Sequence, residues 1–168
     1  YTQFDDHIYL FTARNAPRYK VIRTSLKNPD FNSAEVVFPP SEFVYRYANR
    51  TKDRLYFSAL DGGCNRLIEY DPVTGNSQQL PLPSTESAYI FSSSHHLIDI
   101  YIASNSWTRA GKDQMYNHLT GTLEELGLEP SGEFDNPGWI ASDRILVKSH
   151  DGVEIPLSLI YRKGLKLD

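Results

Sequence analysis

The sequence predicts an all-β chain built from repeated four-stranded units. Two observations predict this class: short aromatic and β-branched runs are separated by turn residues, and similar segments recur about every 46 residues. The 11 tyrosines and 8 phenylalanines lie mostly inside these runs. Because aromatic and β-branched side chains pack well on a pleated surface, such runs favour strands over helices.

Ten predicted strands follow one another along the chain. They are His7 to Thr12, Tyr19 to Thr24, Ala34 to Phe38, Phe43 to Ala48, Arg54 to Ala59, Arg66 to Tyr70, Ala88 to Ser92, Asp99 to Ala103, Gln114 to Asn117 and Leu123 to Leu126. Turn residues separate the strands, as in Asn28-Pro29-Asp30, Asp61-Gly62-Gly63 and Asp71-Pro72. One segment, Thr122 to Gly127, also has a helical pattern, but it is too short for a typical helix.

An internal repeat connects these strands. Tyr70 matches Tyr116, and Thr74-Gly75 matches Thr120-Gly121, both at a spacing of 46 residues. A second series, at spacings of 47 and 45, consists of Ile8-Tyr9, Leu55-Tyr56 and Ile100-Tyr101. A unit of about four strands that recurs at this period is typical of a β-propeller blade.

We therefore expect a partial β-propeller over residues 1–129, with three antiparallel four-stranded blades at about 1–40, 41–84 and 85–129. The first blade is expected to be incomplete and to start at its second strand, since little sequence precedes Asp5. A compact β-sandwich with accidental similarity between segments is the competing interpretation.

The end of the chain departs from the repeat. Residues 130–141 are rich in Pro, Gly, Ser and Asp and are predicted to be a linker, and residues 142–168 are predicted to form a separate β-hairpin. Ser149, His150 and Asp151 supply the residue types of a hydrolase triad. However, adjacent strand residues point to opposite faces, so Ser149 and His150 are not expected to hydrogen-bond as a nucleophile and its base. Asp151-Gly152 suits a two-residue hairpin turn instead.

Composition excludes several classes of partner. The net charge is −4 and no run of like charges occurs, so neither nucleic acid nor an anionic membrane is expected as a partner. No apolar stretch is long enough to cross a bilayer. A soluble protein of the cytoplasm or the periplasm fits these features, and the single Cys64, which has no cysteine to pair with, leaves both compartments open.

No residue is predicted to be catalytic, to bind a cofactor or to ligate a metal. His95-His96 lack a third ligand at a suitable spacing and are expected to lie in an exposed turn with their rings pointing apart. Trp107 and Trp139 are expected to be buried. Cys64 has no histidine nearby in the sequence to activate it, so we expect an unreactive thiol.

Two segments resemble the prolyl oligopeptidase family of serine peptidases. Ser149, Asp151, Gly152, Ile155, Pro156, Lys163 and Gly164 fit the [ST]-x-D-G-x-x-[IV]-P hairpin and the Lys-Gly turn with which that family enters its catalytic domain. The run TARNAPRYKVIRTSL, from Thr12 to Leu26, resembles a motif of the family's fifth blade. The resemblance implies the last three blades of a seven-bladed propeller, followed by the first β-hairpin of an α/β-hydrolase domain.

The resemblance also implies a function. The parent protein would be a serine oligopeptidase that hydrolyses short peptides, with the propeller gating substrate access. The final segment YRKGLKLD is closer to the branch that cleaves after proline than to the oligopeptidase B branch, which cleaves after basic residues. A free-standing propeller-type binding module without enzymatic activity is the alternative from another class.

The catalytic apparatus of the family is not carried over to this chain. In α/β-hydrolases the nucleophile lies in a G-x-S-x-G turn, with Asp and His after it in chain order. No G-x-S-x-G occurs in this sequence. The chain alone is therefore expected to be inactive. Its expected partners are the missing blades and the hydrolase domain, and without them it is expected to self-associate, with the hairpin reaching across to a neighbouring copy.

Overall fold

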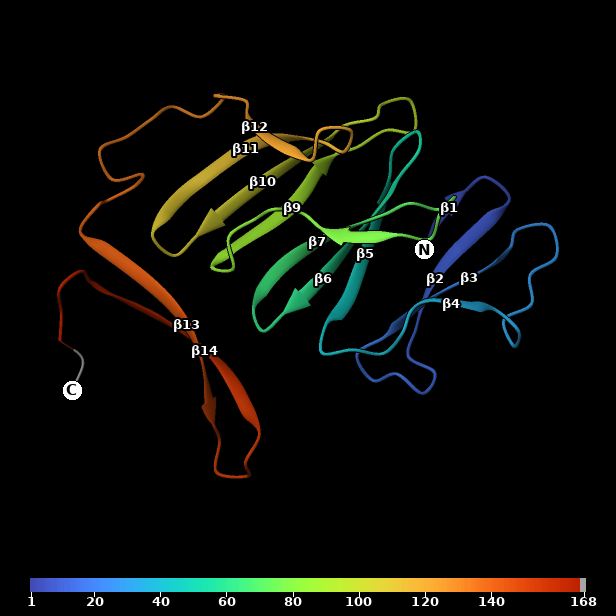
Figure 1. Ribbon diagram of the computed structural model, residues 1–168, viewed down its shortest axis with the longest axis horizontal. Coiled ribbons are helices and arrows are strands. Elements are labelled where there is room, and N and C mark those ends of the chain that lie inside the picture. Colours follow the sequence, from blue (N-terminus) through green and yellow to red (C-terminus); the bar gives the residue numbers. More distant parts are fainter. Residues whose placement is uncertain (167–168) are drawn as a thin grey trace.

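Residues 1–166 form three four-stranded antiparallel sheets and a separate hairpin in the computed structural model (Figure 1). The all-β class predicted from the sequence is confirmed, and three sheets side by side rule out the two-sheet sandwich. Leu167 and Asp168, the last two residues of the predicted hairpin segment, lie outside the described residues. None of the described residues belongs to a helix that could span a membrane.

The first sheet has the strand order β1-β2-β3-β4, and each strand pairs with the next in the chain. Its strands are β1 (Thr2–Phe4), β2 (His7–Thr12), β3 (Lys20–Ser25) and β4 (Glu35–Phe38). The prediction that this unit lacks its first strand is wrong, because β1 pairs with β2 from Thr2↔Tyr9 to Phe4↔His7. A three-residue edge strand is too short to show an alternating pattern in the sequence.

The second and third sheets repeat this meander. The second contains β5 (Val44–Arg50), β6 (Leu55–Asp61), β7 (Cys64–Tyr70) and β8 (Ser77–Gln79). The third contains β9 (Glu86–Ser92), β10 (Ile100–Ser106), β11 (Arg109–Asn117) and β12 (Thr122–Glu125), so the segment with a helical pattern is a strand. In both sheets the first and fourth strands are the edges.

The hairpin consists of β13 (Ile140–Lys148) and β14 (Glu154–Arg162), which pair along their whole length. Residues 126–139, which precede it, contain no strand. The five residues between the strands form a longer turn than the predicted two-residue turn. Gly152 has a φ of +84°, and its N–H donates to the Ser149 carbonyl at 3.0 Å.

The repeat detected in the sequence is present in the structure. Ile8-Tyr9, Leu55-Tyr56 and Ile100-Tyr101 all lie in the second strand of their sheet, in β2, β6 and β10. The Thr-Gly dipeptides occupy matching turns between the third and fourth strands, where Gly75 and Gly121 have φ angles of +77° and +68°. Such angles favour glycine, which explains why the turn chemistry repeats.

Two apolar cores join the three sheets. One lies between the first and second sheets and the other between the second and third. The second sheet is covered on both faces, so all seven residues of β7 are buried, whereas burial alternates along β10 in the third sheet. Alternation along a strand is expected where only one face is covered.

The same tyrosine pair occurs at both interfaces. Tyr9 of β2 meets Tyr70 of β7 edge to face, with ring centroids 6.0 Å apart and an interplanar angle of 69°. Tyr56 of β6 meets Tyr116 of β11 at 6.3 Å and 87°. Edge-to-face contact is a preferred arrangement of aromatic rings. The internal repeat therefore reproduces its own packing contact from one sheet to the next.

The two hydroxyls of the second tyrosine pair differ in their surroundings. Tyr116 donates a 2.8 Å hydrogen bond to Oε2 of Glu69, a buried carboxylate that also accepts from Arg54 Nε at 3.3 Å. Burial, together with the bond to Glu69, raises the pKa of Tyr116. The hydroxyl of Tyr56 is buried and has no hydrogen-bond partner among the described residues.

Candidate functional site

The hairpin is fastened to the second sheet by Arg144 of β13. Its Nη1 and Nη2 atoms donate 2.8 Å hydrogen bonds to Oδ2 and Oδ1 of Asp61, and Nη2 also lies 2.9 Å from the Asp61 carbonyl oxygen. Arg66 Nε lies 3.3 Å from the same carboxylate. The hydrogen bonds from Arg144 are the main reason that the pKa of Asp61 lies below its ordinary value, with Arg66 adding to the effect.

Gly62 allows this close approach. It has a φ of +50°, and a Cβ atom built on it would lie 2.4 Å from Arg144 Nη2 and 2.5 Å from Pro156 Cγ. Any side chain at this position would therefore displace the hairpin or the guanidinium. Asp61, Gly62 and Arg144 thus form a fitted contact, which we call the hairpin latch.

A cavity of about 760 Å³ opens beside the hairpin latch. Val44 and Leu60 line it from the second sheet, and Leu146 and Pro156 line it from the hairpin. The hairpin therefore meets the second sheet through the polar contacts of the hairpin latch, beside an open space, and not through a continuous apolar core. The hairpin is held against the second sheet of its own chain, so the prediction that it reaches across to a neighbouring copy is wrong, while self-association itself stays a prediction.

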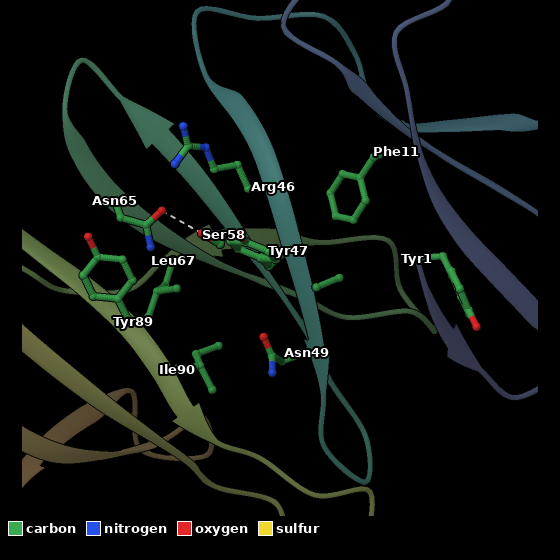
Figure 2. Close-up of a pocket in the computed structure, with 11 residues that line it drawn as sticks. Tyr1, Phe11, Arg46, Tyr47, Asn49, Ser58, Asn65, Leu67, Tyr89 and Ile90 are labelled. Atoms are coloured by element: carbon green, nitrogen blue, oxygen red, sulfur yellow. Dashed lines mark hydrogen bonds between the residues drawn. The ribbon is translucent and has the colours of Figure 1, made fainter.

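A second pocket, of about 420 Å³, lies along β5, the edge strand of the second sheet (Figure 2). Arg46 and Tyr47 line it from β5, and Tyr89 and Ile90 line it from β9 of the third sheet. Figure 2 shows Tyr89 on one side of β5 and Phe11 of the first sheet on the other. The pocket therefore draws side chains from all three sheets.

Ser149 and His150 lie closer to each other than predicted. Ser149 Oγ is 3.2 Å from His150 Nδ1, so the expectation that the two side chains point to opposite faces is wrong. Neither residue is part of a strand, because β13 ends at Lys148, and strand alternation does not apply to them. The carboxylate of Asp151 instead accepts the Val153 N–H at 3.1 Å. A serine–histidine contact in an exposed turn, with no carboxylate of residues 1–166 bonded to the imidazole, does not make a triad.

The predictions for the paired histidines, the two tryptophans and the cysteine are confirmed only in part. His95 and His96 lie in an exposed turn as expected, but their ring centroids are 3.7 Å apart, so they do not point apart. Among residues 1–166 no group of three or more His, Cys, Asp or Glu residues is placed to hold a metal ion. Trp107 and Trp139 are more than half exposed, which contradicts the expected burial, and the Cys64 thiol is buried.

The residues of the hairpin latch and of the second pocket carry no local signal in the sequence that marks them as a site. The Asp61-Gly62-Gly63 turn is visible in the sequence, but its partner Arg144 is 83 residues away. Tyr47 and Tyr89 lie 42 residues apart, off the main period. Their spacing is shorter than the period because the link between the first and second strands has four residues in the second sheet and seven in the third.

Comparisons with known proteins agree with this architecture. Residues 1–124 match the family described as "Prolyl oligopeptidase, N-terminal beta-propeller domain". The prolyl endopeptidase of Elizabethkingia meningoseptica is 27% identical over 171 aligned positions, which cover 97% of this chain and 23% of that protein. The prolyl endopeptidase of Elizabethkingia miricola is 24% identical with the same coverage. The chain therefore spans about a quarter of the length of these relatives.

Solved structures share the fold at lower identity. A structure from a study of two prolyl endopeptidases and their inter-domain dynamics superposes with a TM-score of 0.79 at 21% identity, covering 98% of this chain and 24% of its own. Oligopeptidase B from Trypanosoma brucei superposes with a TM-score of 0.79 at 15% identity. The match covers 99% of this chain and 25% of that chain. Prolyl oligopeptidase B from Galerina marginata, bound to a 35mer hydrolysis and macrocyclization substrate, superposes with a TM-score of 0.76 at 20% identity. The match covers 98% of this chain and 23% of that chain.

Proposed function

Because the chain belongs to the prolyl oligopeptidase family, we propose that it is the propeller portion of a serine peptidase in which the propeller limits access to the active site. Residues 1–129 would be three blades, at about 1–40, 41–84 and 85–129. Residues 130–141 would be the linker, whose last two residues already pair in β13. Residues 142–168 would be the first hairpin of the catalytic domain, and the remaining blades and the triad would belong to the rest of a longer protein.

The observation that carries this proposal is the hairpin β13–β14, which belongs to none of the three sheets. The adjacent residues Ile145 and Leu146 point to opposite faces of the hairpin, and both are exposed, as are Ile155 and Leu157 on β14. A lone two-stranded hairpin is marginal in water. A hairpin with apolar side chains on both faces is suited to join a sheet that is covered on both sides, as in an α/β-hydrolase domain.

The propeller would contribute to catalysis by controlling what reaches the reacting groups. A lid over the active site excludes water and strengthens the electrostatic interactions inside it. It also admits only peptides that are short enough to enter. The hairpin latch would fix one strand pair of the catalytic domain against the second blade, at the Asp61-Gly62 turn. The propeller side chains then act on substrate entry, while the chemistry belongs to the other domain.

Cleavage after proline is the specificity we propose. The two prolyl endopeptidases from Elizabethkingia align with nearly the whole chain, and the final segment resembles the prolyl branch. Cleavage after basic residues is the second candidate, because oligopeptidase B superposes with the same TM-score as a prolyl endopeptidase, although at 15% identity.

The proposal is tested on the longer protein that contains this chain. Two chromogenic peptides that differ only in proline or arginine before the scissile bond measure the specificity. A third substrate embeds the proline site in an unfolded chain of more than a hundred residues and measures the size limit. We expect rapid hydrolysis of the short proline peptide alone. Faster cleavage of the arginine peptide would favour the second candidate, and no cleavage of either short peptide would refute the proposal.

A further inference from the structure

The first strands of the second and third sheets each present an exposed tyrosine to the pocket of Figure 2. Tyr47 of β5 pairs with Ser58, and Tyr89 of β9 pairs with Ala103. Ser58 and Ala103 lie at matching positions of the repeat, 45 residues apart, as Leu55 and Ile100 do. The chain therefore places an aromatic ring at the same point of two successive sheets. With 68% and 55% of their surfaces exposed, Tyr47 and Tyr89 belong to neither core.

Arg46 lies in a β-bulge beside Tyr47. The register of β5 against β6 shifts between Tyr45 and Tyr47, so Arg46 has no opposing residue. A bulge of this kind changes the direction in which a side chain points. Arg46 is exposed and lines the pocket, and within residues 1–166 no acidic side chain forms an ion pair with it. No aspartate or glutamate lines the pocket.

The side chains of Ser58, Asn65 and Asn49 in the pocket already have partners. Ser58 donates a 2.6 Å hydrogen bond to Asn65 Oδ1, drawn as a dashed line in Figure 2, and Asn65 in turn donates to the Ala88 carbonyl. Asn49 Nδ2 lies 3.3 Å from Ser93 Oγ. The Arg46 guanidinium is therefore the charged donor that is left for a ligand, in a pocket that two exposed rings also line.

We propose that Arg46, Tyr47 and Tyr89 bind the carboxyl-terminal end of a proline-containing peptide. The planar guanidinium matches a carboxylate and can donate two parallel hydrogen bonds to it. Exposed aromatic rings provide flat apolar surfaces of the kind that bind proline-rich segments. A volume of about 420 Å³ lies within the range of pockets that bind small ligands.

This inference rests on the proposed function, because it names the end of the peptide substrate that the propeller would recognise. A peptide held by its free terminus at the propeller would be delivered with its scissile bond at a limited distance from that end. Short peptides with a free carboxylate would then be preferred over amidated peptides of the same sequence.

The test uses the 168-residue chain and needs no catalytic residue. The N-acetylated tetrapeptide Ala-Pro-Ala-Pro is titrated into the chain as the free acid and as the amide, and binding is measured by calorimetry. We expect the acid to bind about tenfold more tightly than the amide, since the amide loses the charge-assisted pair. In Arg46→Gln the acid should bind as weakly as the amide. In Tyr89→Leu both peptides should bind more weakly, with the preference for the acid kept.

Arg14→Gln is the matched control, because Arg14 is an exposed arginine outside the pocket whose side chain bonds only to Asn32 among the described residues. It should bind both peptides as the native chain does. Equal affinity of the native chain for acid and amide, unchanged binding of the acid in Arg46→Gln, or no binding of either peptide would each overturn the inference. If the longer protein hydrolyses proline peptides while the chain shows no preference for the acid, this inference fails and the proposed function stands.

Discussion

Replacing Asp61 with asparagine should loosen the hairpin without unfolding the sheets. Arg144 donates to both carboxylate oxygens of Asp61, at 2.8 Å each. Asparagine keeps one oxygen as an acceptor, loses the other, and loses the charge. The bond from Arg144 to the main-chain carbonyl of residue 61 remains.

The size of the effect follows from the exposure of the pair. A hydrogen bond to a charged group contributes about 1.5–3 kcal/mol to stability. The side chains of Arg144 and Asp61 are 18% and 27% exposed, so water screens the pair in part. We therefore take a value toward the lower end, about 2 kcal/mol. At about 1.4 kcal/mol for each factor of ten, the equilibrium constant for detaching the hairpin should rise roughly 30-fold.

The single cysteine of the chain reports this detachment. Cys64 is buried and pairs with Asp61 in the β6–β7 register, directly opposite the residue that holds the hairpin. Its reaction with a coloured disulfide reagent should be limited by opening of the hairpin. In Asp61→Asn the labelling rate should then rise by the same factor of roughly 30, because the rate follows the population of the open form.

Glu35→Gln is the matched control. Glu35 forms a 2.7 Å ion pair with Arg23 in the first sheet, far from the hairpin in sequence. Its loss should leave Cys64 labelling unchanged, and circular dichroism should show that both variants keep their strands. If Asp61→Asn labels no faster than Glu35→Gln, the Arg144–Asp61 pair does not hold the hairpin in place.

Four further predictions follow from the structure. Tyr116→Phe should lower the free energy of unfolding by about 1.5 kcal/mol or more, since it removes a hydrogen bond to a buried carboxylate, whereas Tyr56→Phe should be neutral or stabilising because that hydroxyl has no partner. Urea denaturation of both variants measures the contrast, and equal losses would contradict it. The folded-state pKa of Asp61 is lowered, so the stability it contributes is complete above its unfolded pKa of about 3.9 and is lost as pH falls through the lower folded value. Divided by the labelling rate of a free cysteine at the same pH, which corrects for the falling thiolate fraction, the Cys64 rate of the native chain should therefore rise below about pH 4, with no such step in Asp61→Asn. A serine-directed fluorophosphonate should not label the chain, and stoichiometric labelling at Ser149 would show that its contact with the imidazole is catalytic. Sedimentation velocity should show that the chain associates at micromolar concentration through the apolar hairpin faces, and a concentration-independent monomer would refute this.

Strands with strong local patterns could be predicted from the sequence. His7–Thr12 is identical to the prediction, and β6 begins one residue later than predicted, because aromatic and aliphatic residues fill both strands. The two missed strands of the sheets, β1 and β8, are three residues long. β8 has the sequence SQQ and is exposed throughout, so neither apolar alternation nor β-branched residues mark it.

The features that define the sites depend on long-range contacts. Arg144 and Asp61 meet because β13 returns to the end of β6, and no local pattern announces a pair 83 residues apart. The pocket beside Arg46 depends on a bulge whose position is set by the pairing of two strands. The contact between Ser149 and His150 depends on where a strand ends, which is the least certain property of a predicted strand.

The complete burial of β7 has a consequence for the order in which the chain opens. In a row of stacked units, stability is approximately the sum of the units and of the interfaces between nearest neighbours. The second sheet takes part in two interfaces and each outer sheet in one. An outer sheet can therefore separate at the cost of one interface, but the amides of β7 reach solvent only when an interface on at least one side is lost. Slow amide exchange should concentrate in the middle of the row, and a destabilised second sheet would leave its neighbours as independent pieces.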